Sequence, residues 1–153
     1  MRLLLDENVP APLTSTVQTL LRRSHDVAHV IQLKGWSGTK DLQLYDQAAD
    51  EGFELVVTND AKQMRRKTEV EAIARSGLHR VQYPHRHSGL VGTGLAIAVV
   101  CAALPSVLDE LASTDGQRLV TLRAIDPGRD HRYAVCDPVT DPPKFWPRVD
   151  RPR

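Results

Sequence analysis

The chain opens on the stretch Arg2-Leu3-Leu4-Leu5-Asp6, a short apolar run that ends at a carboxylate. A second stretch of the same kind is Leu55-Val56-Val57-Thr58-Asn59-Asp60. Short continuous apolar runs are typical of strands that are covered on both faces, as in parallel sheets. Because the carboxyl ends of neighbouring parallel strands open into one crevice, we expect Asp6 and Asp60 to approach each other.

Helical patterns alternate with these strands. The first predicted helix covers residues 9–23, with Asn8 as its N-cap, and the second covers residues 40–51, with Thr39 as its N-cap and Leu42 facing inward. This alternation predicts a mainly parallel sheet with right-handed crossovers. The remaining predicted elements are strands over residues 27–31, 80–83 and 119–125 and helices over residues 70–75 and 90–111.

The chain of 153 residues has the size of a single domain. Prolines and charges dominate the sequence from Asp126 onward, so we predict a folded domain over residues 1–125 and a Pro-rich tail or arm over residues 126–153. Phe145 and Trp146 in this tail could dock on a surface, including that of a partner protein.

The most apolar stretch, residues 90–104, is shorter than the roughly 20 residues that a membrane span requires. We therefore expect a buried helix here, kinked or broken at Pro105. Its apolar side chains suit a dimer interface as well as a core. The N-terminus lacks the charged and apolar regions of a secretory signal, which predicts a cytoplasmic protein with no membrane partner.

The formal net charge is +1, and 25% of the residues are charged. This balance excludes a nucleic-acid binder that depends on overall positive charge, although it is compatible with a local basic patch. Cys101 lies in an apolar run and Cys136 in the Pro-rich segment, so neither predicts a disulfide framework or a zinc site. His79, His85 and His87 have no cysteine nearby and are likewise a poor zinc signature.

A third acidic residue, Asp41, stands at the predicted start of the second helix. Carboxylates that converge need a cation, and oxygen ligands suit Mg²⁺ or Mn²⁺, ions that orient water and stabilise the charge developing in phosphodiester cleavage. Each acid also has a structural alternative. Asp6 can satisfy N–H groups of a turn, Asp41 can stabilise a helix N-terminus, and Asp60 can close an Asx turn.

Basic residues follow Asp60 closely, at Lys62, Arg65 and Arg66. They can bind phosphate oxygens without reading bases, or they can form a solvated helix face. The Thr58 hydroxyl can hydrogen-bond a neighbouring carboxylate or a water molecule at the site. We therefore group these four residues as candidates for binding a substrate.

Three motifs, in order, carry a resemblance to a known family. The stretch Leu4-Leu5-Asp6-Glu7-Asn8-Val9-Pro10 resembles the opening of PIN-like domains related to VapC toxins. Gly38-Thr39-Lys40-Asp41 is similar to the second acidic motif of that family, and Val56-Val57-Thr58-Asn59-Asp60 to the third. The resemblance spans roughly residues 2–110.

The resemblance implies a three-layer α/β/α sandwich with a mainly parallel central sheet. It also implies that Asp6, Asp41 and Asp60 are metal ligands and catalytic residues of an Mg²⁺- or Mn²⁺-dependent ribonuclease. Such a toxin would have RNA as its substrate and a small antitoxin protein as its partner.

The chain departs from this family in one respect. Many PIN nucleases have a fourth acid just beyond the third, but the residues directly after Asp60 include none. Glu69 could substitute for it only if the following helix folds back over the site. Three hypotheses therefore stay open: a toxin ribonuclease, a catalytically degenerate PIN-like interaction protein, and an enzyme acting on other phosphate esters. A phosphoaspartate phosphatase is disfavoured, because Asn8 replaces the second acid of an Asp-x-Asp pattern.

Overall fold

The computed structural model describes residues 1–125, apart from the side chain of Asp41. Five strands form a single sheet in the order β2-β1-β3-β4-β5, and all neighbouring strands are parallel. The strands are β1 Arg2–Leu5, β2 Asp26–His29, β3 Leu55–Thr58, β4 His79–Gln82 and β5 Leu119–Thr121. The predicted parallel sheet is confirmed.

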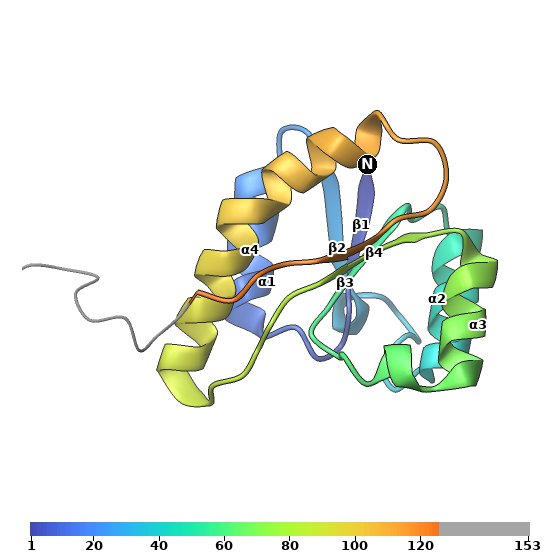
Figure 1. Ribbon diagram of the computed structural model, residues 1–153, viewed down its shortest axis with the longest axis horizontal. Coiled ribbons are helices and arrows are strands. Elements are labelled where there is room, and N and C mark those ends of the chain that lie inside the picture. The colour runs from blue at the N-terminus through green and yellow to red at the C-terminus, as the bar shows by residue number, and fades with distance from the viewer. Residues whose placement is uncertain (126–153) are drawn as a thin grey trace, which may run out of the picture.

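Helices cover both faces of this sheet (Figure 1). The α-helices are α1 Ala11–Leu21, α2 Asp41–Asp50, α3 Lys67–Ser76 and α4 Gly89–Ala112, and the 3₁₀ helices are η1 Val30–Gln32 and η2 Gln63–Arg65. Helices α1 and α4 pack together on one side of the sheet, and α2 and α3 pack together on the other. The three-layer α/β/α sandwich predicted from the sequence is therefore confirmed.

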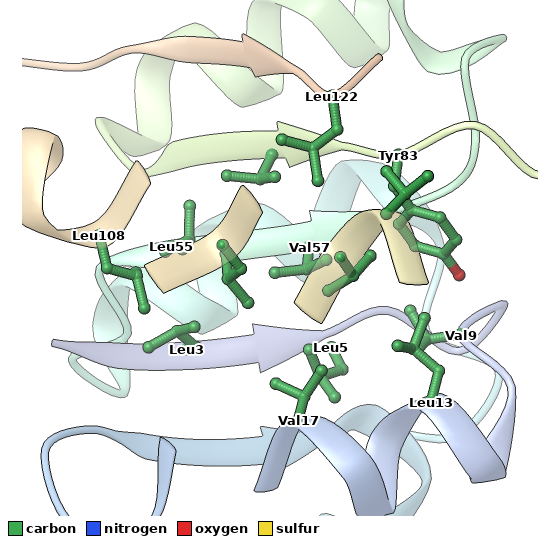
Figure 2. Close-up of a cluster of buried hydrophobic side chains, with 14 of the residues drawn as sticks. Leu3, Leu5, Val9, Leu13, Val17, Leu55, Val57, Tyr83, Leu108 and Leu122 are labelled. Carbon is green, nitrogen blue, oxygen red and sulfur yellow. The ribbon is translucent and has the colours of Figure 1, made fainter. Parts of the chain in front are cut away.

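Alternation along the strands divides the apolar side chains between two cores. Leu3, Leu5 and Val57 contribute to the core beneath α1 and α4, which Figure 2 shows in close-up. Leu4 and Val56 contribute to the core beneath α2 and α3. Both faces of the central strands are thus covered, which explains why their sequences are continuously apolar.

Both predicted N-caps are wrong. Helix α1 begins after Pro10 and α2 begins after Lys40, and neither of these residues caps its helix with a side-chain hydrogen bond. Asn8 lies too early because the turn from Asp6 to Val9 precedes the helix, with Val9 N donating to Asp6 O. The loop before α2 ends in a turn instead of a Thr39 cap.

Two predictions about helix interiors, the inward side chain of Leu42 and a break at Pro105, are also wrong. Leu42 is 40% exposed, because Leu44 and Tyr45 occupy the buried side of α2. Helix α4 continues through Pro105 without a break. An interior proline costs a helix about 3 kcal/mol. Here the buried side chains on either side, such as Leu104 and Leu108, anchor both halves of the helix in the core.

Helix α4 is also longer than the apolar run suggests. Its 24 residues, with a mean hydropathy of 2.1 over the most apolar window, are long and apolar enough to cross a membrane by length and composition alone. The expectation that this segment is too short is therefore wrong. The helix nevertheless packs on α1, and eight of its residues are buried.

The predicted tail, residues 126–153, lies outside the described residues, together with Cys136, Phe145 and Trp146. The division at residue 125 and the docking of the tail therefore stay predictions.

Candidate functional site

The carboxyl ends of β1 and β3 lie side by side and bring two of the predicted site residues together. Leu5 pairs with Val57 in the register of these strands, and Asp6 N donates to Val57 O at 3.0 Å. This bond holds Asp6 at the sheet edge, where its side chain is only 3% exposed. Burial of a carboxylate requires compensating partners, so the surroundings of Asp6 define the site.

Thr58, the last residue of β3, supplies one of these partners. Its hydroxyl donates to Asp6 Oδ2 at 2.7 Å and accepts from Asp60 N at 3.0 Å. A single oxygen thus links the Asp6 carboxylate to the backbone of Asp60. Thr58 itself is fully buried.

Asp60 occupies a tight turn. Its Oδ1 accepts from Lys62 N at 2.7 Å, the arrangement of an Asx turn, and its backbone carbonyl accepts from Arg80 at 2.7 Å. The structural role considered for Asp60 is therefore present. It leaves Oδ2 without a hydrogen bond in the described part of the chain, and Asp60 is partly exposed.

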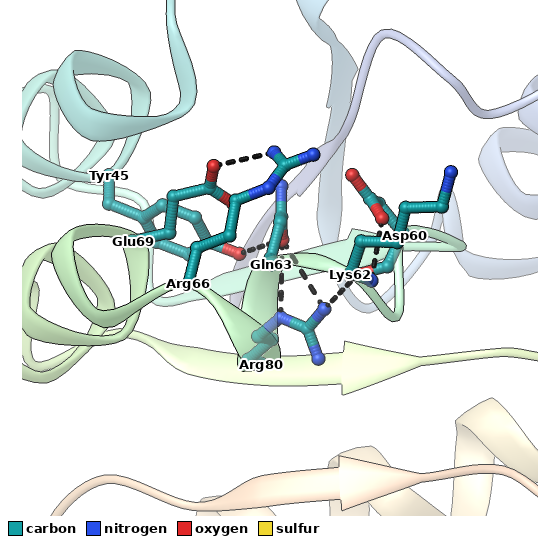
Figure 3. A network of polar contacts seen from close by, with 7 residues as sticks. All are labelled: Tyr45, Asp60, Lys62, Gln63, Arg66, Glu69 and Arg80. Atoms are coloured by element: carbon teal, nitrogen blue, oxygen red, sulfur yellow. Dashed lines mark hydrogen bonds and ion pairs between the residues drawn. The ribbon is translucent and has the colours of Figure 1, made fainter.

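Arg80 supports this turn from within the sheet and was not identified from the sequence. Its side chain extends from β4 toward Gln63 and the Asp60 carbonyl (Figure 3). Arg80 is only 2% exposed, and its guanidinium also donates to Gln82 Oε1 at 3.0 Å. None of the described ion pairs includes it, although arginine is rarely buried without a charged partner. The signal in the sequence was an arginine inside a predicted strand.

Gln63 completes this network. Its Oε1 accepts from the Tyr45 hydroxyl of α2 at 3.1 Å as well as from Arg80 (Figure 3). Gln63 is 1% exposed. The turn after Asp60 is therefore fixed to α2 and β4 by buried hydrogen bonds.

Glu7 ties the loop before α2 to the same edge. Its carboxylate accepts from Ser37 Oγ and from Gly38 N, each at 3.3 Å. Glu7 is exposed, and its carboxylate has a structural role in holding this loop. This loop leads directly to Asp41, the first residue of α2.

The basic residues lie beyond Asp60. Lys62 and Arg65 are exposed, whereas the Arg66 guanidinium forms an ion pair with Glu69 at 2.7 Å. These three cations follow the Asp60 turn closely along the chain. Their arrangement suits an anionic ligand that approaches Asp60 from solvent.

Tyr83 and His85 come shortly after β4 in the sequence, and both lie next to Asn59. The Asn59 amide lies 3.2 Å from His85 Nδ1, and the His85 ring stacks on Tyr83 with ring centroids 6.4 Å apart. Burial, and then the charge of Asp6, raises the pKa of the Tyr83 hydroxyl, while neighbouring Asn59 opposes the shift. Tyr83 is therefore a neutral wall of the site at physiological pH.

The chemistry of the donors fits a hard cation such as Mg²⁺ or Mn²⁺. A carboxylate has about four lone-pair positions. The Asp6 carboxylate accepts from Glu7 N at 2.7 Å and from the Thr58 hydroxyl, which leaves capacity for a cation. Among the side chains that the structure describes, no three His, Cys, Asp or Glu lie close enough to hold one ion. The Asp41 side chain is not in that set, so the predicted trio is neither confirmed nor contradicted.

Comparison with known proteins agrees with this geometry at the level of the family. A family model described as a PIN like domain matches residues 1–83, which include β1, β3, β4 and all three predicted acids. No curated protein and no solved structure matches the chain significantly.

Proposed function

Because the chain belongs to the PIN-like domain family, whose members are commonly metal-dependent nucleases, we propose that it is a metal-dependent endoribonuclease. The observation that carries this proposal is the link from the buried Asp6 carboxylate through the Thr58 hydroxyl to Asp60. Such a rigid connection keeps two acids at one sheet edge, and preorganised charge is the main requirement of a catalytic metal site.

In this proposal Asp6, Asp41 and Asp60 hold the Mg²⁺ or Mn²⁺. When bound, the ion supplies Lewis-acid stabilisation of the phosphodiester and lowers the pKa of a water molecule. Thr58 is buried and acts as a positioning residue, which orients the Asp6 carboxylate.

The basic side chains would hold the substrate backbone. Lys62, Arg65 and Arg66 contact phosphate groups without selecting bases. Their replacement should therefore weaken RNA binding and reduce its salt dependence while leaving metal binding in place.

We further propose that the protein is the VapC-type toxin of a bacterial type II toxin–antitoxin pair and acts in the cytoplasm. A small antitoxin would relieve its toxicity by covering the acidic crevice. Expression alone should then arrest growth, and coexpression of the neighbouring small gene should restore it. Homodimerisation is part of the same proposal, and the measured mass in solution tests it.

The decisive experiment compares wild type with Asp60→Asn and with Asp50→Asn, a control that neutralises an exposed acid at the far end of α2. We expect cleavage of a mixed RNA substrate in Mg²⁺ or Mn²⁺, none in EDTA, and loss of both cleavage and metal uptake in Asp60→Asn alone. A parallel DNA substrate distinguishes a ribonuclease from an enzyme that acts on other phosphate esters.

The second candidate function is a catalytically degenerate PIN-like interaction protein. The observation in its favour is that the described side chains contain no group of three metal-binding residues. No cleavage with any metal, together with no metal uptake by calorimetry, would establish this alternative. Partner binding would then survive Asp60→Asn.

A further inference from the structure

A cavity of about 170 Å³, here called the α4 cavity, lies beside the first half of α4. Helix α4 contributes the apolar side chains of Leu95 and Val99 to its wall. The opposite wall comes from the segments that follow β4 and β5, and Figure 1 shows both segments leading to this part of α4. The wall is mainly apolar, and Arg86 and His87 are its basic members.

The α4 cavity lies at the same edge of the sheet as Asp6 and Asp60. All neighbouring strands are parallel, so the carboxyl ends of β4 and β5 point the same way as those of β1 and β3. Strand β4 is also the direct neighbour of β3, the strand that leads to Asp60. Ligands of open parallel sheets bind at this edge. A substrate held at the two acids can therefore extend along the edge to the cavity.

The segment after β4 connects the cavity with the acidic site. His85 stands between two residues of the cavity wall, and its Nδ1 lies 3.2 Å from the amide of Asn59, which directly precedes Asp60. Two residues further on, the backbone of His87 lies so close to α4 that the helix has a glycine there, Gly92. Both ends of this short segment are thus held in place, which fixes the cavity relative to the acids.

The size and the lining of the cavity suit one aromatic ring. A cavity of roughly 150 Å³ in a protein core accommodates a benzene molecule. Leu95 and Val99 are buried and offer apolar contacts to the faces of a ring. Arg86 and His87 are exposed, and none of the ion pairs among the described residues includes either of them, so both can donate hydrogen bonds to a ligand.

We propose that the α4 cavity binds a pyrimidine base of single-stranded RNA next to the phosphodiester group at the acidic site. This inference rests on the proposed function and names the part of the RNA that the enzyme selects. A pyrimidine combines a single ring with carbonyl acceptors for Arg86 and His87. Unstacked bases of single-stranded RNA are recognised in this way, by contacts to their faces and hydrogen bonds to their edges.

The cavity and the basic residues after Asp60 then have different tasks. Lys62 and Arg65 meet phosphate groups, which are the same in every nucleotide. The cavity meets a base, and only contacts to bases carry sequence information. The preference for a pyrimidine should therefore depend on the cavity alone.

The test fills the cavity from its solvent side. Ala124 is exposed and lines the cavity, so Ala124→Trp places a large ring in it without changing the core. The control is Ala112→Trp, at the exposed last residue of α4. Fluorescence anisotropy in EDTA measures the affinity for short oligouridylate without cleavage, and inorganic polyphosphate serves as a ligand that has charge but no bases. We expect Ala124→Trp to weaken oligouridylate binding about tenfold and to leave polyphosphate binding unchanged, with Ala112→Trp like wild type.

Three results would overturn the inference. The first is equal oligouridylate affinity in wild type and Ala124→Trp, and the second is a wild-type chain that does not bind oligouridylate. The third is an equal loss of oligouridylate and polyphosphate affinity, since the cavity would then not act on bases. An equal loss of oligoadenylate affinity in Ala124→Trp would overturn the choice of a pyrimidine.

A second pair of variants tests the polar contacts and leaves the shape of the cavity wall nearly unchanged. Arg86→Gln removes a guanidinium from the cavity, whereas Arg123→Gln removes the same charge from an exposed position after β5. If Arg86 donates to the base, Arg86→Gln weakens oligouridylate binding more than Arg123→Gln does. Equal losses in the two variants would contradict the inference.

The proposed nuclease and the proposed base cavity fail in different ways. Metal-dependent RNA cleavage, together with equal oligouridylate affinity in wild type and Ala124→Trp, leaves the nuclease standing and removes the cavity from it. Weaker oligouridylate binding in Ala124→Trp, without cleavage in any metal, keeps the cavity as a base-binding site and overturns the nuclease.

Discussion

The hydroxyl of Thr58 donates a 2.7 Å hydrogen bond to the Asp6 carboxylate, joining the ends of β1 and β3. Both residues are buried, and the same hydroxyl accepts from Asp60 N. One side-chain oxygen therefore determines the position of two acids that lie far apart in the sequence. The candidate site is built into the sheet and does not depend on a mobile loop for this contact.

Thr58→Val keeps the shape of the side chain but removes this hydroxyl. We expect the free energy of unfolding to fall by about 1–3 kcal/mol, because a buried carboxylate oxygen and a backbone N–H lose their partner. Urea denaturation measures this loss, and RNA cleavage should decrease with it. Thr58→Ser, which keeps the hydroxyl, is the control. If the valine variant were as stable and active as the serine variant, the positioning role would be refuted.

Arg80→Lys keeps the charge but loses the planar fork that reaches several acceptors. The present guanidinium contacts Gln63, Gln82 and the Asp60 carbonyl, a set that a single ammonium group does not reproduce. We expect a loss of about 1.5–3 kcal/mol in denaturation experiments. Arg118→Lys at an exposed position should stay within about 0.5 kcal/mol of wild type. Similar effects from the two substitutions would show that the buried network does not support the Asp60 turn.

Gly92 and Gly94 should respond in opposite directions to alanine. A Cβ atom at Gly92 would lie 1.7 Å from the carbonyl oxygen of His87, a backbone contact that requires the chain to shift. We expect Gly92→Ala to lower the free energy of unfolding by about 1–3 kcal/mol. Nothing lies within 4 Å of a Cβ at Gly94, so Gly94→Ala should stabilise α4 by about 0.5–1 kcal/mol. Thermal denaturation of the two alanine variants tests whether the His87 carbonyl lies this close to Gly92.

Protonation of His79 should make the stability of the pairing between β4 and β5 dependent on pH. Burial, and then the Arg118 charge, lowers the pKa of His79, with Glu54 opposing. Its Nδ1 also accepts a hydrogen bond from Arg118 N at 3.0 Å, which requires the unprotonated nitrogen. The unfolded chain therefore binds the proton more readily than the folded one. The contribution of this group to stability is complete above the ordinary pKa of 6.5 and is lost as the pH falls through the lower folded value.

The measurement for His79 is the free energy of unfolding at pH 7.5 and pH 5, in wild type and in His79→Asn, which keeps an acceptor but does not titrate. The wild type should lose more stability on acidification than the variant. An equal loss in both proteins would place the acid sensitivity elsewhere in the chain.

Prediction from the sequence succeeded where one local pattern dominates. The apolar runs before Asp6 and Asp60 predicted β1 and β3, and the strand–helix alternation predicted the layers. Strand β3, Leu55–Thr58, lies within the quoted stretch that ends at Asp60. Helix starts were less predictable, because the loops before α1 and α2 use backbone turns in place of the expected caps at Asn8 and Thr39.

The sequence by itself determined the order of the layers and the shared edge of Asp6 and Asp60, because side-chain alternation and parallel strand direction follow from local apolar patterns. Only the tertiary structure decided the surroundings of those acids. Arg80 beneath the Asp60 turn, His85 beside Asn59 and the uninterrupted helix at Pro105 all depend on contacts between elements distant in sequence. The energy of such contacts comes from burial and partner geometry, which one segment of sequence does not specify.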